Sequence, residues 1–277
     1  MYQRGHAQRI STVPTDGQPR LAVRNIAVVA RDWLKQTTHG PGKFLDSDMG
    51  FAPHFAEIAR VASRHKADVI LFCLWSHNEQ KLGELSRKMF FPQGTRHKAV
   101  ILGVNRRPER EDVEVHFRSR RSPVKLRQQF GKSSDRDAKK EAFLADASAR
   151  QFGSSLIVLC GETNIIETKR DEKRTIVDHY GFLDRLRDTQ VRLILNPIHN
   201  YMRRYEMPLK RQALARAAHT VVCVWNRGCK GGTESRLPWA AYREGKDITD
   251  QIEEVNAIDS QLGIRIGILN VPQYLAG

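Results

Sequence analysis

The sequence contains no long apolar run. None of its hydrophobic stretches approaches the roughly 18 to 20 consecutive apolar residues that a membrane-spanning helix needs, although 40% of its 277 residues are hydrophobic. Residues 1–20, MYQRGHAQRISTVPTDGQPR, also lack the apolar centre of a secretory signal. We therefore expect no membrane association, and we interpret residues 1–20 as a flexible lead-in to a single domain, 21–277.

Cysteine is scarce and is not arranged in pairs. The four cysteines (Cys73, Cys160, Cys223 and Cys229) form no CxxC motif, and three lie in or beside apolar, strand-like runs. This pattern favours reduced thiols in a cytoplasmic protein over a disulfide framework, and it lacks the spacing of zinc ligands.

Motifs that hold cofactors are missing as well. The sequence has no GxxxxGK[ST] or GxGxxG loop for phosphates, no HExxH or HxH metal motif, and no GxSxG serine elbow. The two glycines of CKGGTES do not lie between a strand and a helix in the required way. We expect chemistry without a metal or an organic cofactor.

Positive charge, by contrast, is abundant. Lys and Arg total 46 against 31 acids, which gives a net charge of +15 and a pI near 10.0. Such a charge attracts polyanions and is compatible with nucleic-acid contact. The densest stretch, 106–134, carries no zinc-finger, RNP-type or helix-turn-helix signature, so a solvated basic surface remains the alternative.

Apolar strand-like stretches and helical stretches alternate along the chain. Amphipathic or charged helices are expected at 50–67, 135–150, 178–190 and 209–220, and strands at 20–33, 67–75, 97–107, 111–119, 154–160, 191–197, 221–228 and 262–271. No helix separates the strands near 99–118, which indicates antiparallel pairing there. The pattern predicts one α/β domain that mixes parallel and antiparallel strands.

Cys160 lies where the stretch SSLIVLCGETNII, 154–166, changes from apolar to polar residues. The four residues before it, Leu-Ile-Val-Leu, are all apolar, and polar residues follow within two positions. One reading is a packed thiol at the end of a buried strand, because free cysteine is among the most buried residue types. The other is a nucleophile at the edge of a sheet, which requires a nearby cation or base.

Several segments, taken in order, resemble the nitrilase or carbon–nitrogen hydrolase superfamily. LIVLCGE resembles its strand ending in the nucleophilic cysteine, with Cys160 and Glu162 at the matching positions. VRLILNP resembles its next core strand, ending at Asn196 and Pro197. The segment RQALARAAHTVVCVWNRG resembles its Arg-Ala helix (Arg216, Ala217) and following strand (Asn226, Gly228), and 230–248 resembles its hairpin.

The resemblance implies an α-β-β-α layered sandwich with mixed sheets. It also implies a Glu base, a Lys that stabilises the tetrahedral intermediate, and a Cys nucleophile, in that chain order. For the lysine we favour Lys125 over Lys132, because the Pro-Val-Lys-Leu sequence follows an alternating strand and supplies apolar neighbours.

The expected glutamate is missing. The family's strand ends in Pro-Glu, and the acid's position falls on Leu74, which cannot act as a base. Glu79 follows five residues later and is our candidate, while His77 is a second because imidazole can take a thiol proton near neutral pH. A site without a base is the remaining alternative.

Three further residues are candidates for binding the substrate. Glu162 could orient the lysine or bind an amine, or simply cap the turn. His199 and Asn200 follow Asn-Pro and would share the carboxyl edge of the sheet with Cys160, where ligands of open α/β sheets gather.

Together these features predict a hydrolase or amidase that cleaves a non-peptide C–N bond of an amide or nitrile through a thioester. The resemblance also implies self-association into a homo-oligomer, or membership of a larger complex. The alternative is a catalytically degenerate nitrilase-like module with a binding or regulatory role, associated with nucleic acid through its basic surface, as in a bacterial defence system.

Overall fold

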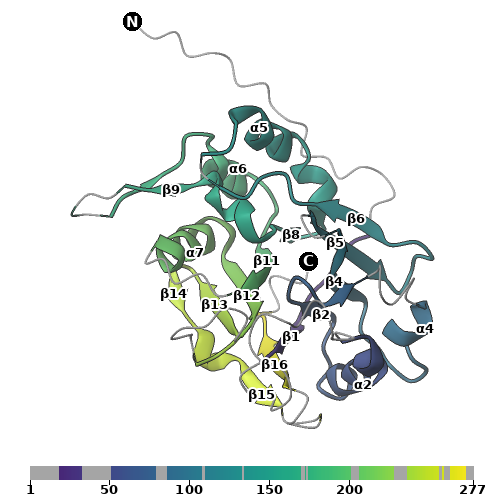
Figure 1. Cartoon of the computed structure of the whole chain (residues 1–277). Helices are drawn as coiled ribbons and strands as arrows, with labels where there is room; N and C mark the ends of the chain where they lie inside the picture. Colours follow the sequence, from purple (N-terminus) through teal and green to yellow (C-terminus); the bar gives the residue numbers. More distant parts are fainter. Residues whose placement is uncertain are drawn as a thin grey trace, which may run out of the picture.

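The computed structural model describes residues 19–32, 51–78, 86–107, 110–132, 134–169, 172, 174–200, 206–227, 236–255, 258 and 263–272. Two mixed β-sheets, with helices outside them, account for most of this part of the chain (Figure 1).

The first sheet is built around parallel strands from the amino-terminal half. Its order is β15-β16-β1-β2-β4-β5-β6, with β3 beside β4. β1, β2 and β4 run parallel, while β16 and β5 are antiparallel to their neighbours β1 and β4. The strands are β1 Asn25–Arg31, β2 Val69–Phe72, β3 His77–Asn78, β4 Ala99–Arg107, β5 Arg110–Phe117, β6 Val124–Arg127, β15 Glu253–Val255 and β16 Ile264–Asn270.

The second sheet has the order β14-β13-β12-β11-β8-β7. β8, β11 and β12 are parallel, and β13 is antiparallel to β12. Its strands are β7 Gln151–Phe152, β8 Ser155–Ile157, β11 Leu193–Asn200, β12 Thr220–Asn226, β13 Trp239–Arg243 and β14 Lys246–Asp247. The strands β9 (Glu167–Thr168) and β10 (Ile176–Val177) form a separate pair.

The helices include one long helix on each outer face. α2 (Phe55–Arg64) lies outside the first sheet and α7 (Glu206–Ala218) outside the second. The others are α4 Arg87–Phe90, α5 Asp137–Ala145 and α6 Phe182–Asp188, with 3-10 turns η2 Ala52–His54, η3 Ala147–Arg150, η4 Cys160–Ile165 and η5 Thr249–Gln251. Among the described residues, no helix combines the length and apolar character needed to cross a bilayer.

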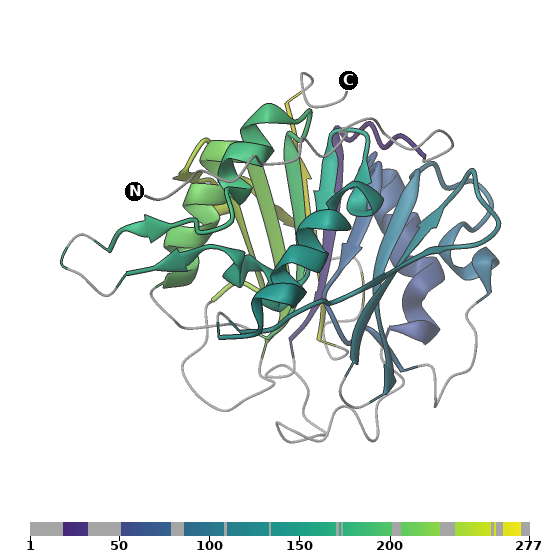
Figure 2. The ribbon, with the colours of Figure 1, turned by 90° about the horizontal axis from the view of Figure 1, so that it is seen from above.

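The two sheets face each other, and their inner faces form one continuous core of buried aliphatic and aromatic side chains (Figure 2). All four residues of β2 are buried, as its uninterrupted apolar sequence predicts for a strand covered on both faces. The prediction of an α-β-β-α sandwich with mixed sheets is confirmed, and so is the antiparallel pairing of β4 with β5.

The carboxyl ends of the parallel strands meet where the sheets approach each other. Just beyond β2, the backbone N–H of Leu74 donates to the carbonyl of Ile198 in β11, at 3.1 Å. The ends of β1 and β12 are joined in the same way, because the N–H of Arg227 donates to the carbonyl of Arg31 at 2.8 Å. Backbone from both sheets therefore converges at one edge.

Two buried asparagines complete this edge. Asn226, the last residue of β12, donates to the carbonyl of Leu74 at 2.9 Å and accepts from the Cys73 thiol at 2.9 Å. Asn196 donates to the carbonyl of Val158 at 2.6 Å. Carbonyls left unpaired where a strand ends are costly to bury, so each amide satisfies one.

Two expected elements end earlier than predicted. The strand expected to reach Cys160 stops at Ile157, because Asn196 takes the carbonyl of Val158 and the chain turns into η4. The strand expected to reach Trp75 stops at Phe72, and Trp75 adopts a left-handed backbone with φ of 60°. Both strands thus end in a sharp turn at the shared edge.

Close packing at this edge predicts the effect of a methyl group at Gly103 in β4. A Cβ there would lie 2.5 Å from the Cα of Leu74 and 2.7 Å from the carbonyl oxygen of Cys73. Gly103→Ala should lower the free energy of unfolding by about 1–3 kcal/mol through overpacking. The control is Gly131→Ala, where a Cβ meets only the Gln128 amide, at 3.6 Å. Urea unfolding should separate the two variants, and equal stabilities would contradict the packing argument.

Candidate functional site

Cys160 is the first residue of the buried turn η4. The chain leaves β8 in extended form, and the N–H of Glu162 then donates to the carbonyl of Leu159 at 2.9 Å. The Thr163 hydroxyl donates to the carbonyl of Cys160 at 3.1 Å. The cysteine therefore lies on a tightly hydrogen-bonded bend that follows a parallel strand directly.

Glu162 holds this bend in place. Its carboxylate accepts from the N–H of Leu159 at 2.8 Å, from the N–H of Gln129 at 2.9 Å, and from the Arg150 guanidinium at 2.9 Å. Both charged side chains are fully buried, at 0% exposure. Burial raises the pKa of Glu162 to about 7, and Arg150 opposes that shift. Of the two uses foreseen for Glu162, this geometry matches the cap of the turn.

Arg150, the partner of Glu162, was not among the site residues predicted from the sequence. Its guanidinium also donates to the Asp146 carboxylate at 3.1 Å and to the carbonyl of Arg127, and it lies over the Phe143 ring, 5.3 Å from the centroid. Nothing in the local sequence distinguishes it from the many exposed arginines. The sequence offered one indirect sign of such a residue: if Glu162 is buried, a cationic side chain must lie beside it.

The segment that leaves β6 packs directly on the cysteine turn. The Gln128 side chain accepts from the N–H of Gly161 at 3.3 Å, and the Asn164 amide donates to the carbonyl of Gly131 at 2.8 Å. A Cβ on Gly161 would lie 2.4 Å from the Cα of Gly131. Glycine at 161 is therefore required for this close approach.

The Cys160 side chain is 1% exposed. Its neighbour Cys223 donates to the side-chain oxygen of Asn196 at 3.4 Å. The pKa of Cys223 is raised, first by burial and to a smaller extent by the nearby Cys160, while Arg211 opposes the shift. Within the described residues, the Cys160 thiol forms no hydrogen bond or ion pair.

The two candidate lysines lie on the segment around β6. Lys125 is in β6 and forms a 3.7 Å ion pair with Glu114, with 58% of its side chain exposed. Lys132 is exposed, and its backbone N–H donates to Asp135 at 2.9 Å. In the described part of the chain, neither ammonium is hydrogen-bonded to a residue of the cysteine turn.

A different lysine reaches that turn. Lys210, in α7, is 2% exposed, and its ammonium lies 2.7 Å from the side-chain oxygen of Asn164. Sequence reasoning missed Lys210 because it looks like one of several cations in LKRQALARAA. Its burial next to η4 follows from how α7 packs on the second sheet.

The family's pattern has its acid at the position of Leu74, and the described residues that follow it end at Asn78. Leu74 is 0% exposed and lies at the shared edge beside Ile198. His77 is 3% exposed and begins β3. Glu79 lies outside the described residues.

His199 lies where the two sheets meet. Its ring is half-buried and stands 4.6 Å, centroid to centroid, from the ring of Trp75. Its neighbour Ile198 accepts from Leu74, and β11 runs parallel to β8 with Leu195 opposite Ile157. β8 ends at Ile157, so this register does not extend to Cys160, which lies in η4. Asn200 ends β11 beside Asn226, and its side chain lies outside the described residues.

No group of three or more His, Cys, Asp or Glu side chains that could hold a metal ion occurs among the described residues.

Comparison with known proteins gives structural matches only. No family model matches the sequence, and no curated protein does either. Among solved structures, an amidase from Nesterenkonia sp. is 12% identical, with a TM-score of 0.49, over 93% of this chain and 94% of the other. A form of that amidase in complex with butyramide is 13% identical, with a TM-score of 0.48, over 93% and 95% of the two chains.

This chain is similar to a nitrilase-superfamily amidase. Another structure of the Nesterenkonia enzyme, assigned to that superfamily, has 12% identity and a TM-score of 0.46 over 93% of this chain and 95% of the other. The similarity concerns the course of the chain.

The burial of Glu162 predicts a pH-dependent contribution to stability. Its pKa is raised from 4.5 to about 7 in the folded chain, so between these values the folded state binds more protons than the unfolded state. Its contribution is therefore greatest at low pH and is lost as the pH rises towards about 7. The free energy of unfolding of the wild type minus that of Glu162→Gln should fall over this range and then level off.

Urea unfolding at about pH 5, 6, 7 and 8 measures this difference. The exposed Glu141 on α5 provides the control, since Glu141→Gln should give a nearly constant difference. A wild type that gains stability over Glu162→Gln as the pH rises would contradict the argument.

Proposed function

We propose that this protein is a carbon–nitrogen hydrolase that uses Cys160 to cleave a small amide or nitrile. The observation that carries the proposal is the position of Cys160, on a hydrogen-bonded bend directly after parallel strand β8, two residues beyond Val158, whose carbonyl accepts from Asn196. Ligands of open α/β sheets bind outside the carboxyl ends of the strands. The order of sequence motifs around Cys160, Asn196 and Asn226 supports the same reaction class.

The proposed reaction on an amide has two steps. The Cys160 thiolate attacks the carbonyl carbon, a C–S bond forms, and the C–N bond breaks as the leaving nitrogen takes a proton. Water then attacks the thioester, the C–S bond breaks, and a carboxylic acid leaves with the thiol restored. A base is needed twice, first for the thiol and then for the water.

Among the described groups, we propose His199 as that base. It follows Ile198, whose carbonyl accepts from the N–H of Leu74 at the edge where both sheets converge. A Cys–His pair activates the thiol by proton transfer to the imidazole. Glu79 remains the alternative from sequence, and His77 the third candidate. Lys125 stays our sequence-based proposal for the cation that stabilises the intermediate, and Lys210 is a buried alternative beside η4.

We further propose a cytoplasmic location, in which the free thiols Cys73, Cys160 and Cys223 stay reduced, and self-association through the sheet layers.

A second candidate function is a binding module without catalysis. The observation in its favour is Leu74, a fully buried leucine at the position where the family's pattern has its acid. The net charge of +15 points to a polyanionic partner for such a module.

Labelling of cysteine tests the nucleophile. Fluoroacetamide adds its acetamide group to the active-site cysteine in one structure of the Nesterenkonia amidase. We expect the same adduct on Cys160, measured by peptide mass spectrometry. Cys73 and Cys223 are internal controls, since burial raises the pKa of both thiols, that of Cys73 to about 12. Cys160→Ala should lower ammonia release from small amides by at least about 10³-fold.

Absence of an adduct on Cys160, or amidase activity retained in a folded Cys160→Ala variant, would contradict the hydrolase. A wild type inactive on a panel of amides and nitriles would favour the binding module.

A pH profile tests the base. His199→Gln should lower kcat/KM by about 10²–10⁴-fold and remove the acidic limb of the pH profile, because the base must be unprotonated to accept the thiol proton. The exposed His179 serves as the control, and His179→Gln should leave the profile unchanged. An unchanged acidic limb in His199→Gln, together with its loss in Glu79→Gln, would assign the base to Glu79.

A further inference from the structure

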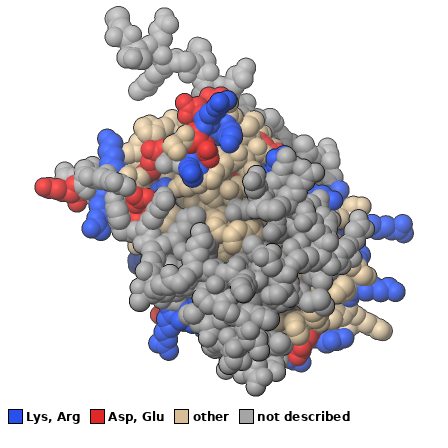
Figure 3. Space-filling model, viewed as in Figure 1, with Lys and Arg blue, Asp and Glu red and all other residues tan. Residues whose placement is uncertain are grey.

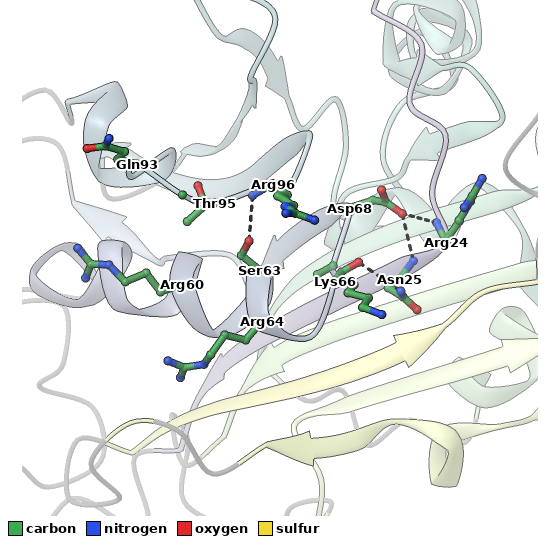
Figure 4. Close-up of a pocket in the computed structure, with 12 residues that line it drawn as sticks. Arg24, Asn25, Arg60, Ser63, Arg64, Lys66, Asp68, Gln93, Thr95 and Arg96 are labelled. Carbon is green, nitrogen blue, oxygen red and sulfur yellow. Dashed lines mark hydrogen bonds between the residues drawn. The ribbon is translucent and has the colours of Figure 1, made fainter.

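A second site candidate lies at the opposite ends of the strands. A cavity of about 740 Å³ opens between α2, the turn before β2 and the loop after α4 (Figure 4). Its lining includes Asn25 at the start of β1 and Asp68 directly before β2. These are the amino ends of the parallel strands, whereas Cys160 follows the carboxyl end of β8. The cavity is therefore separate from the candidate catalytic site.

Five cationic side chains line this cavity: Arg24, Arg60, Arg64, Lys66 and Arg96. All five are exposed, and within the described residues none of them forms an ion pair. Arg60 and Arg64 are four residues apart on α2 and so lie on one face of that helix, about 6 Å apart along its axis.

Asp68 is the one acid among the described residues of the lining, and its charge is already paired. The Asp68 carboxylate accepts from the N–H groups of Arg24 and Asn25, at 2.7 Å and 3.3 Å, and pairs with Lys98 at 3.0 Å. Glu57, one turn before Arg60 on α2, is outside the lining and forms no ion pair with it among the described residues. The cavity is thus a concentration of positive charge without an internal counter-charge.

The cavity wall is fixed by hydrogen bonds, so the cations are held on a defined frame. The Ser63 hydroxyl accepts from the N–H of Arg96 at 2.9 Å, which joins the loop to α2. Lys66 has a left-handed backbone, with φ of 57°, and its carbonyl accepts from the Asn25 amide at 3.2 Å. Figure 4 shows both contacts, with Arg60 and Arg64 extending from α2.

More cations border the cavity along the same edge of the sheet. β5 ends opposite the start of β4, with Phe117 paired to Ala99. The residues that follow include the exposed Arg120 and Arg121, together with the partly buried Arg118, whose pKa is lowered by burial and by the like charge of Arg87. Arg118 donates to the hydroxyl of Thr95, a residue of the cavity lining, at 2.8 Å, so a rim of positive charge extends from the cavity towards the end of β5.

From this arrangement we propose that the cavity and its rim bind the phosphates of a nucleic-acid strand. A row of unpaired arginines and lysines on a fixed concave surface suits successive phosphates, which Arg binds through paired N–H donors. Among the described residues that line the cavity, none has an aromatic side chain on which a base could stack. Binding is consequently to the backbone and independent of base sequence. This proposal does not depend on the hydrolase activity.

The face shown in Figure 3 has no comparable concentration of cations among its described residues. On the face in Figure 3, Lys and Arg side chains stand at separate places around the rim, interspersed with acids near α5 and β9. Three cations outside the cavity provide a matched control: Arg136, Arg185 and Lys246 are exposed, are not in its lining and form no ion pair among the described residues.

The test uses the full chain, two fluorescent single-stranded oligonucleotides of about 20 nucleotides and unrelated sequence, and anisotropy titrations over a range of salt concentrations. The cavity variant carries Arg60→Ser, Arg64→Ser and Arg96→Ser. The control variant carries Arg136→Ser, Arg185→Ser and Lys246→Ser, so both lose the same charge. All the substituted side chains are exposed, and thermal unfolding checks that each variant folds.

We expect both oligonucleotides to bind the wild type alike. The cavity variant should bind at least about tenfold more weakly, and its plot of log K against log salt should be shallower by about 2, since each single-strand phosphate contact contributes about 0.7. The control variant should change binding less than about threefold.

Three results would overturn the proposal. The first is no binding to the wild type at low salt. The second is equal weakening in the two variants, which would make binding a property of net charge alone. The third is displacement by inorganic phosphate or heparin as effective, per phosphate or sulfate, as displacement by unlabelled oligonucleotide, which would identify a general anion site.

Discussion

The buried Glu162 carboxylate is the interaction on which the cysteine turn depends. It links three pieces of chain, because it accepts from the N–H of Leu159, from the N–H of Gln129 and from the Arg150 guanidinium. A buried charge without such partners would cost several kcal/mol, on the order of 3–5 when one partner is removed. The same contacts bring the segment after β6 against η4 and hold Cys160 at its first position.

Around this turn, the two sheets act as a single frame. Asn226 and Asn196 satisfy carbonyls at the ends of two strands, and the N–H of Leu74 reaches across to Ile198. These contacts join the strand ends of the two sheets along one edge, and side chains far apart in the sequence become neighbours there. The amino ends of the strands have the opposite character, with unpaired arginines around an open cavity. One fold thus presents two chemically different edges.

Much of this architecture could be predicted from the pattern of residues. Uninterrupted apolar runs indicated the buried strands, such as β2, and the absence of a helix between β4 and β5 indicated their antiparallel pairing. Boundaries were less predictable. The sequence before Cys160 continues as an apolar strand, yet β8 stops at Ile157 because Asn196, from a distant strand, takes the next carbonyl.

The sequence by itself determined the fold class and the position of Cys160 after a buried strand. It also determined that a leucine, Leu74, stands where the family's pattern has an acid, and that the chain carries an excess of positive charge. It could do so because hydrophobic periodicity and charge are local properties of the chain. Only the tertiary structure decided that Arg150 pairs with Glu162, that Lys210 reaches the cysteine turn, and that particular arginines share a cavity. Those outcomes depend on which elements pack together, and a buried cation and a solvated one look the same in a sequence.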